Sequence, residues 1–281
     1  MSITTPTPKS RIDARYAGAT PSTLETSPAP DWNPILDTLL SHRSVRAFAP
    51  DPLPVGTTEL LVAAAQSAAS SSNLQIWSVV AVQDPERKAR LAGFAGDQAQ
   101  IREAPLFLAW LIDVTRLERL AERAGKPAEG LDYLDTFLMG AIDAALAAQN
   151  AVTAAESLGL GTVYIGALRN KPELVAEELK LEPGLFAVFG LCVGRPDPAR
   201  PSAVKPRLPQ KSVLFHEQYK RQNIAHEVDD YDRAMNGFYT AQGMPATQWS
   251  EHSTERMRSA SNLRGRHRLV EALHSLGFKL R

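Results

Sequence analysis

The chain has 281 residues, with 31 basic and 31 acidic side chains and a formal net charge of zero. A neutral balance supplies no overall field toward nucleic acid or an anionic membrane, so any anion must be held by local groups. The longest strongly apolar runs, such as residues 106–112, are far shorter than the roughly 20 residues that span a bilayer. The composition therefore favours a globular protein without a nucleic-acid or membrane partner.

Cysteine and histidine usage argue against several kinds of site. Cys192 is the one cysteine, which rules out an intramolecular disulfide and a thiolate metal cluster and is compatible with the reducing cytoplasm. Its setting, FAVFGLCVG, is typical of a buried strand and favours packing over a reactive thiol. The six histidines show neither the HExxH spacing nor a carboxylate partner for zinc, so we expect no metal.

Residues 1–30 are rich in proline, serine and threonine and poor in large apolar groups. This composition is typical of a disordered tail, and it lacks the basic-then-apolar order of a secretory signal. We therefore expect the folded domain to comprise residues 31–281.

The first half of that domain alternates helices with strands. We expect a short helix in ILDTLLSH, a helix at 57–69 with Thr57 as N-cap, a strand at 77–83, a Pro-started helix at 85–94 and a buried strand at 106–113.

One long helix dominates the second half. Apolar residues recur at helical spacing from 131 to 158, and Gly159 and Gly161 then end the helix in the manner of a C-cap. A strand at 162–166, a helix at 172–180 and a strand at 186–194 follow, and the rest of the chain is mostly helical. The pattern predicts an α+β fold.

Two basic segments suit a phosphate group. In His42-Arg43-Ser44-Val45-Arg46, each guanidinium can donate two parallel hydrogen bonds to phosphate oxygens, and Ser44 and Arg46 point to one side of an extended chain. In KPRLP (205–209), prolines stiffen an extended segment that holds two cations on one side. The alternative for each segment is a solvated basic patch on the surface.

Two further segments carry hydroxyls, amides or glycines. The SSSNLQ cluster at 70–75 suits ribityl hydroxyls or the edge of a heteroaromatic ring, although such turns are also common between elements. GLGTVYIG at 159–166 superficially resembles a dinucleotide fingerprint, but its glycines follow a helix and lead into a strand, the reverse of the required order. Gly166 at a strand end instead lets a flat ring approach the backbone closely.

In this order, the stretches HRSVRAF, SSSNLQ, AAQNAVTAAESLGLGTVYIGALRN, FGLCVGRP and KPRLP resemble the nitroreductase family, in particular its NADPH-type flavin reductases and group A oxygen-insensitive nitroreductases. The resemblance covers about residues 35–215, and AAESLGLGTVYIGALRN is its most specific part. It implies an α+β fold with a central, mainly antiparallel sheet flanked by helices and a helical C-terminal excursion. It also implies an intertwined homodimer with FMN at the interface.

The resemblance further implies roles for individual residues. The phosphate and the ribityl chain would be bound by His42, Arg43, Ser44 and Arg46, with Lys205 and Arg207 on the opposite side. The partner subunit would contribute Ser71, Ser72 and Gln75. The flavin ring would be contacted by Gln98, Tyr164, Ile165, Gly166 and Ala167. The substrate would meet Arg169 at the pocket mouth and Asn73, which stands where relatives commonly carry an aromatic residue.

The implied activity is FMN-dependent reduction of nitro compounds, quinones or free flavin by NADPH or NADH, with two electrons transferred in a ping-pong mechanism. No side chain is expected to be catalytic, because FMN carries the hydride chemistry. The alternatives are a flavin reductase that supplies a partner monooxygenase, a non-catalytic flavin-binding protein and a purely structural dimerisation module. Segment 216–250 lacks the arginine pair of NADPH-preferring relatives, for which Lys220 and Arg221 are candidate substitutes.

Overall fold

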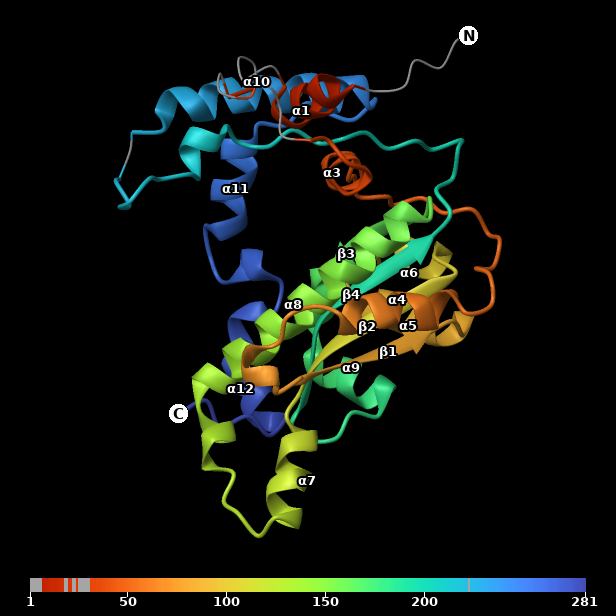
Figure 1. Cartoon of the computed structure of the whole chain (residues 1–281), viewed down its shortest axis with the longest axis vertical. Helices are drawn as coiled ribbons and strands as arrows, with labels where there is room; N and C mark the ends of the chain where they lie inside the picture. The colour runs from red at the N-terminus through yellow and green to blue at the C-terminus, as the bar shows by residue number, and fades with distance from the viewer. Residues whose placement is uncertain (1–6, 18–19, 22–23, 25–30, 222) are drawn as a thin grey trace. The chain divides into compact units, whose positions relative to one another are not determined.

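The computed structural model describes residues 7–17, 20–21, 24, 31–221 and 223–281. Its internal contacts divide the chain into two compact units, which are described separately (Figure 1). The first unit, called here the helical unit, comprises residues 1–43 and 202–262. The second, called the sheet unit, comprises residues 44–201 and 263–281.

The sheet unit is built on four antiparallel strands. They are β1 (Trp77–Val82), β2 (Leu106–Asp113), β3 (Gly161–Ile165) and β4 (Leu185–Gly194). The strand order is β1-β2-β4-β3, so β1 and β3 form the two edges. All four strands were expected from the sequence at nearly these positions, and the predicted α+β fold with an antiparallel sheet is confirmed.

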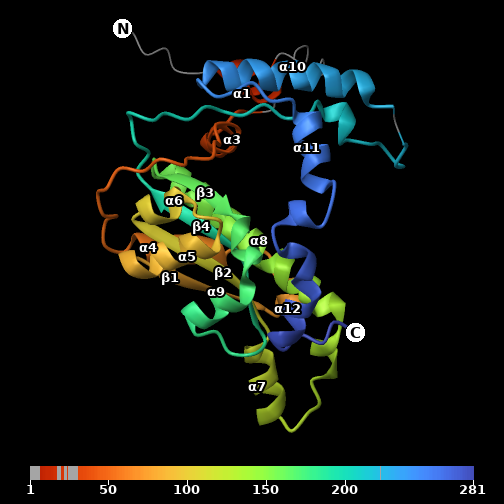
Figure 2. The ribbon, with the colours of Figure 1, turned by 180° about the vertical axis from the view of Figure 1, so that it is seen from behind.

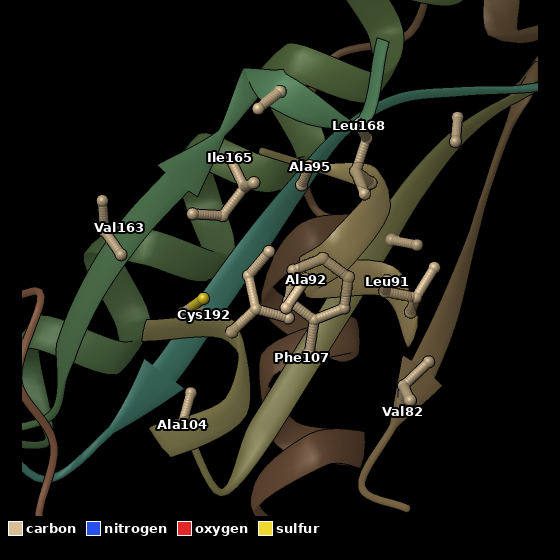
Figure 3. Packing of buried hydrophobic residues seen from close by; sticks show 14 of the residues in the cluster. Val82, Leu91, Ala92, Ala95, Ala104, Phe107, Val163, Ile165, Leu168 and Cys192 are labelled. Carbon is tan, nitrogen blue, oxygen red and sulfur yellow. The ribbon is translucent and has the colours of Figure 1, made fainter. Parts of the chain in front are cut away.

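Both faces of the sheet are covered, which is why β2 is buried along its whole length. Phe107, Ala109 and Leu111 pack in one core with residues of α5 (Pro85–Phe94), α6 (Ala99–Glu103) and α9 (Pro172–Leu179). Figure 2 shows the ribbon of α5 against the sheet, and Figure 3 shows the ring of Phe107 beside Leu91 and Ala92 of this helix. The alternate residues Leu108 and Trp110 face α4 (Thr57–Gln66) and α8 (Leu134–Ser157). A strand whose successive side chains enter two apolar cores reads as the continuous apolar run LFLAWLI.

Helix α8 is the long helix expected from the sequence. Its alanines at 144, 147, 148, 151 and 155 are fully buried against the sheet and α4. Among the described residues, α8 alone is long and apolar enough to cross a membrane by length and composition, a test that core helices of soluble proteins also pass. Gly159 follows the helix at φ 75°, a left-handed conformation that glycine adopts without strain.

Several local predictions were wrong or incomplete. The N-cap of α4 is Gly56, whereas Thr57 is its first residue and donates its hydroxyl to the carbonyl of Pro54. Gly161 is the first residue of β3 and has no capping role. The C-terminal region is more broken than expected, with α12 (Leu269–Ser275) preceded by the short 3₁₀ turns η5 (Ser261–Leu263) and η6 (Arg266–Arg268).

Other short elements were not expected from the sequence. They are α6, α7 (Thr115–Arg123) and the 3₁₀ turns η1 (Ser71–Asn73), η2 (Glu129–Asp132), η3 (Gly166–Asn170) and η4 (Gln210–Ser212). Such short segments carry too few apolar positions for a helical period to be recognised.

The helical unit contains α1 (Pro8–Tyr16), α3 (Pro34–Leu40), α10 (Ala225–Ala241) and α11 (Trp249–Met257). Helix α1 lies in the segment expected to be a disordered tail, so that expectation does not hold for residues 7–17. Thr7 caps the helix at the amide of Ser10, Pro8 occupies its first position, and Ile12 and Arg15 are buried. Residues 1–6, 18–19, 22–23 and 25–30 of that segment lie outside the described residues.

Candidate functional site

The segment after His42 runs along the outer edge of β3. Ser44 forms a parallel bridge with Thr162, and the amide of Val45 donates to the Thr162 carbonyl at 2.8 Å. Val45 is buried, and a Cβ at Gly161 would lie 2.6 Å from its Cγ2. Only glycine therefore leaves room for this close approach. Because side chains alternate in an extended segment, Ser44 and Arg46 are turned away from the core, as predicted.

The end of β3 passes directly into η3. Tyr164 is 37% exposed and meets Phe189 edge-on at 5.2 Å, whereas Ile165 and Ala167 are buried, so only their backbone is available to a ligand. Arg169 folds back over Gly166, and its guanidinium donates to the carbonyl of Val188. Burial lowers the pKa of Arg169 and raises that of Tyr164, in the latter case with a smaller contribution from the nearby Glu156.

The turn that carries Gln98 lies beside η3. A Cβ at Gly96 would lie 3.7 Å from the side-chain nitrogen of Asn170, the last residue of η3. Gln98 itself is half-buried, with its amide donated to the carbonyl of Ala95 and its carbonyl accepting from Gln100. The structure thus brings together segments 44–46, 96–98 and 164–169 around β3.

The SSSNLQ segment forms a tightly constrained turn at the end of α4. Ser72, Asn73 and Gln75 have φ of 49°, 55° and 52°, the left-handed region that non-glycine residues adopt at a cost of roughly 1–2 kcal/mol each. Ser71, Ser72, Asn73 and Gln75 are exposed. Strain concentrated in one exposed turn is typical of a binding site.

Asp143, a residue not singled out from the sequence, holds this turn in place. Its carboxylate is 1% exposed and accepts hydrogen bonds from the Ser70 hydroxyl at 2.6 Å and the Ser71 amide at 3.0 Å. The Ser70 hydroxyl in turn accepts the amide of Gln75 at 2.9 Å. The sequence signal that could have identified Asp143 is a lone carboxylate on the buried face of the alanine-rich α8. Buried carboxylates are rarely without hydrogen-bond partners, so such a residue indicates a polar contact with another segment.

A cavity of about 570 Å³ opens beside the same turn. It is lined by residues of α4, of the turn, of β1 and of α7, among them Asn73, Gln75, Trp77 and Arg116. Arg116 donates to the carbonyl of Gln75 and to the hydroxyl of Ser78. None of the segments around β3 contributes to this cavity.

The turn and the β3 segments therefore lie apart within the sheet unit. The turn leads into β1, and β1 and β3 are opposite edges of a sheet four strands wide. With neighbouring strands about 4.8 Å apart, these edges are separated by about 14 Å. Ser71, Ser72 and Gln75 do not join the other predicted cofactor residues of the same sheet unit.

The helical unit brings two predicted basic segments together. Arg15 of α1 donates to the carbonyl of His42 at 2.9 Å and to the carbonyl of Lys205 at 3.1 Å. The ammonium of Lys205 lies 5.5 Å and 5.1 Å from the ring centres of Phe238 and Tyr239. Arg207 is exposed and, like Arg43, is turned toward solvent within its unit.

Cys192 lies in the sheet core and not at any of these sites. It is fully buried in β4 (Figure 3), and burial raises the pKa of its thiol, partly offset by the cation of Lys88. A thiol that stays protonated at neutral pH is a poor nucleophile, so the prediction of a packing role is confirmed.

The protein has an α+β fold built on an antiparallel sheet. Arg46 and Ser44 lie along one edge of this sheet, and a strained polar turn lies at the other. These groups suit a cofactor that carries a phosphate and a ring. Comparison with known proteins identifies the class more narrowly. The chain belongs to the nitroreductase family: residues 39–195 match the Nitroreductase family, and residues 205–281 match the Nitroreductase family, C-terminal domain.

Individual relatives cover most of the chain. It is 37% identical over 231 residues to the NADPH-flavin oxidoreductase of Vibrio harveyi, which spans 82% of this chain and 93% of that protein. It is 37% identical over 224 residues to the FMN reductase (NADPH) of Bacillus subtilis strain 168, which spans 78% and 89%. The solved structure of NfrA2 from B. megaterium has a TM-score of 0.83 at 36% identity, covering 89% of this chain and 100% of that one.

The residues present fit FMN as the family's cofactor. Within the helical unit, Arg43 and Arg207 expose guanidiniums that suit a phosphate. Within the sheet unit, Arg46 exposes another guanidinium and the hydroxyl of Ser44 suits a ribityl chain. The backbone of 165–167 at a strand end offers the amide and carbonyl groups that the edge of a heteroaromatic ring requires. Gly166 carries no Cβ, but the Arg169 guanidinium lies over it, so a ring approaching there would contact Arg169.

Proposed function

We propose that this protein binds one non-covalent FMN per subunit and uses it to transfer two electrons from NADPH or NADH to a small acceptor, either a nitro compound, a quinone or free flavin. Membership of the nitroreductase family supports the proposal, as do relatives named NADPH-flavin oxidoreductase and FMN reductase (NADPH). The cationic donor set described above is the observation in this chain that carries it.

Each predicted residue has a binding role in this proposal. The phosphate would be held by His42, Arg43, Arg46, Lys205 and Arg207, and the ribityl chain by Ser44. The ring would lie against the backbone of Tyr164, Ile165, Gly166 and Ala167, with Gln98 nearby. When bound, FMN supplies the hydride chemistry, so the side chains orient ligands and exclude water without serving as acid or base. Arg169 and Asn73 would face the substrate.

We further propose that the working enzyme is a homodimer. Ser71, Ser72 and Gln75 lie at the opposite edge of the sheet from Ser44 and the end of β3, which favours two different subunits as the sources of these two sets for one ligand. A second copy of the chain can supply the missing turn, since a two-fold interface presents the same surface from both subunits.

An exposed apolar stripe on α8 offers the surface for such a dimer. Leu134, Leu138, Ile142 and Leu146 recur every four residues and are 44% to 57% exposed. The constrained turn adjoins this stripe, because Asp143 anchors it and the Ser71 hydroxyl reaches the sulfur of Met139. Contiguous exposed apolar surface on a helix favours a protein interface. Packing through this stripe would carry the turn of each subunit toward its partner.

The dimer proposal is tested by placing a charge in the stripe. Ile142→Asp puts an ionised group on a side chain that is 57% exposed in the single chain, so the fold should tolerate it. We expect sedimentation to change from dimer to monomer and FMN uptake to fall in parallel. A variant that remains dimeric with full FMN content would contradict an interface at α8.

The acceptor and the nicotinamide donor distinguish the alternatives within this function. A relative named FMN reductase (NADPH) supports free flavin as an acceptor, and with it the supply of a partner monooxygenase. Lys220 and Arg221 are both exposed and supply cations for a 2′-phosphate, which favours NADPH over NADH. We place the enzyme in the cytoplasm, where both nicotinamides are available.

The decisive experiment is an anaerobic titration of the purified, FMN-loaded protein with NADPH and then NADH. Loss of the visible flavin absorption at one equivalent per subunit is expected, and sharing of one pocket by donor and acceptor predicts parallel double-reciprocal plots. A colourless protein that takes up no FMN would overturn the function. Flavin that neither nucleotide bleaches would indicate a non-catalytic flavin-binding protein.

A further inference from the structure

Helix α1 contains an arginine that is buried among backbone carbonyls. Arg15 is 8% exposed, and its guanidinium donates to the carbonyls of Leu40, His42 and Lys205 at 3.1, 2.9 and 3.1 Å. The backbone is involved as well, because the amide of Arg207 donates to the carbonyl of Arg15 at 2.9 Å. A single residue thus ties together two segments that are more than 160 positions apart in the chain.

These two segments are the ones that carry the phosphate-suited cations of the helical unit. His42 and Arg43 follow directly on α3, and Lys205 and Arg207 flank the buried Pro206. These four bonds of Arg15 go to backbone atoms of α3, of the His42 segment and of the Lys205–Arg207 segment, so none of them uses the side chain of a phosphate-suited cation. The exposed guanidinium of Arg207 donates to the carbonyls of Lys205 and Pro206.

Other contacts dock α1 in the same place. Arg11 makes two hydrogen bonds to the carboxylate of Asp37 on α3, at 2.8 and 3.0 Å. The hydroxyl of Tyr16 accepts from the amide of Gln210, which follows the KPRLP segment. The helix therefore bridges α3 on one side and residues 205–210 on the other.

We propose that α1 is a built-in brace for cofactor binding, with Arg15 as a positioning residue that holds the His42–Arg43 and Lys205–Arg207 segments in register for the FMN phosphate. The inference rests on the proposed function, but it concerns a helix outside the family match, which begins at residue 39. Two flexible basic segments lose conformational entropy when they close on one phosphate, and a brace that fixes them beforehand removes that cost from binding.

The brace has a specific signature, because it acts on the phosphate and not on the flavin ring. Arg15→Ala should weaken FMN binding about tenfold, the effect of about one hydrogen bond to a charged group. Binding of riboflavin, which lacks the phosphate, should change little. A general loss of structure would weaken both ligands, so the ratio of FMN to riboflavin affinity separates positioning from folding.

The experiment measures both dissociation constants by flavin fluorescence quenching on the apoprotein of the full chain. Arg15→Lys keeps the charge but not the planar fork, so it should recover part of the FMN affinity. Lys9→Ala is the matched control, because Lys9 pairs with Asp13 on the exposed side of the same helix. It should leave the ratio unchanged.

The outcomes are separable. If the unsubstituted protein binds FMN no better than riboflavin, the cationic phosphate site of the proposed function fails. If it prefers FMN and Arg15→Ala keeps the same ratio, the brace alone is refuted. An Arg15→Ala protein that loses riboflavin to the same extent as FMN also refutes positioning, since the residue would then act on the fold as a whole.

Discussion

The two units of the molecule differ in the contacts that stabilise each of them internally. The sheet unit buries a continuous apolar core on both faces of β2. Among the described residues of the helical unit, six are buried, namely Ile12, Arg15, Pro206, Tyr231, Asp232 and Met235. Two of these six are charged, and both are satisfied by hydrogen bonds, Asp232 by the amide of Ser250 at 3.0 Å.

This contrast separates two sources of order. In the sheet unit, close packing leaves little room for added volume, so shape dominates the energetics. In the helical unit, specific polar contacts hold segments that share little apolar surface, so single hydrogen-bonding groups dominate the energetics. Added side-chain volume should therefore lower the free energy of unfolding in the sheet unit and not in the helical unit. Loss of a polar group should lower it more in the helical unit than in the sheet unit.

The largest expected effect is that of added volume in the sheet. A Cβ at Gly190 in β4 would overlap the ring of the fully buried Phe107, with Cε2 at 2.5 Å and Cζ closer still. Gly190→Ala should lower the free energy of unfolding by about 3 kcal/mol, because the ring cannot move without disturbing the core. Denaturant unfolding measures this change.

Gly237→Ala provides the matched test in the helical unit. No atom lies within 4 Å of a Cβ at Gly237, which is an exposed interior position of α10. Alanine there should stabilise the helix by about 0.5–1 kcal/mol. Equal destabilisation by both substitutions would remove the distinction between the two units.

Asp143 is an exception within the sheet unit, because its buried carboxylate holds a turn by hydrogen bonds and not by apolar packing. Asp143→Ala leaves the hydroxyl of Ser70 and the amide of Ser71 without their acceptor. We expect a loss of about 2 kcal/mol in unfolding free energy and increased amide exchange at residues 71–75. Unchanged exchange in the turn would show that its left-handed backbone is held by other contacts.

Removal of a cation from the helical unit should affect ligand binding more than stability. Arg207→Ala should weaken FMN binding by about 1.5 kcal/mol, the scale of a hydrogen bond to a charged group. Arg233→Ala is the control, since Arg233 is an exposed arginine of the same unit that pairs with Asp230. Titration calorimetry that gives equal affinities for the two variants would place Arg207 outside the site.

The smallest effect concerns the ion pair between α1 and α3. Hydrogen bonds from Arg11 lower the pKa of Asp37, so its contribution is fully present above the unfolded value of about 3.9 and disappears as the pH falls through the folded value. The side chain of Asp37 is 39% exposed, which limits the contribution to less than about 1 kcal/mol. Amide exchange in α1 should rise below pH 4, and Asp37→Asn should remove that pH dependence.

The sequence determined the secondary structure of the sheet unit in some detail. Helix α5 begins and ends where the pattern predicted, and the apolar run at 106–112 was recognised as a buried strand. The family resemblance supplied the segments that are proposed to carry the site. These signals are local: a period of two or 3.6 residues, a proline at a helix start and a glycine after a helix end can all be read within a short window.

Contacts between distant positions were decided only by the tertiary structure. The composition of residues 1–30 indicates disorder, yet the guanidinium of Arg15 donates to the carbonyls of Leu40, His42 and the distant Lys205. In the sequence, Asp143 is an isolated carboxylate within an alanine-rich helix, and its hydrogen-bond partners in the turn at 70–75 are apparent only in the folded structure. The strand order that sets β1 and β3 at opposite edges likewise has no local signature. A polar group carries no periodicity that identifies its partner, so its role emerges only when packing has excluded water around it.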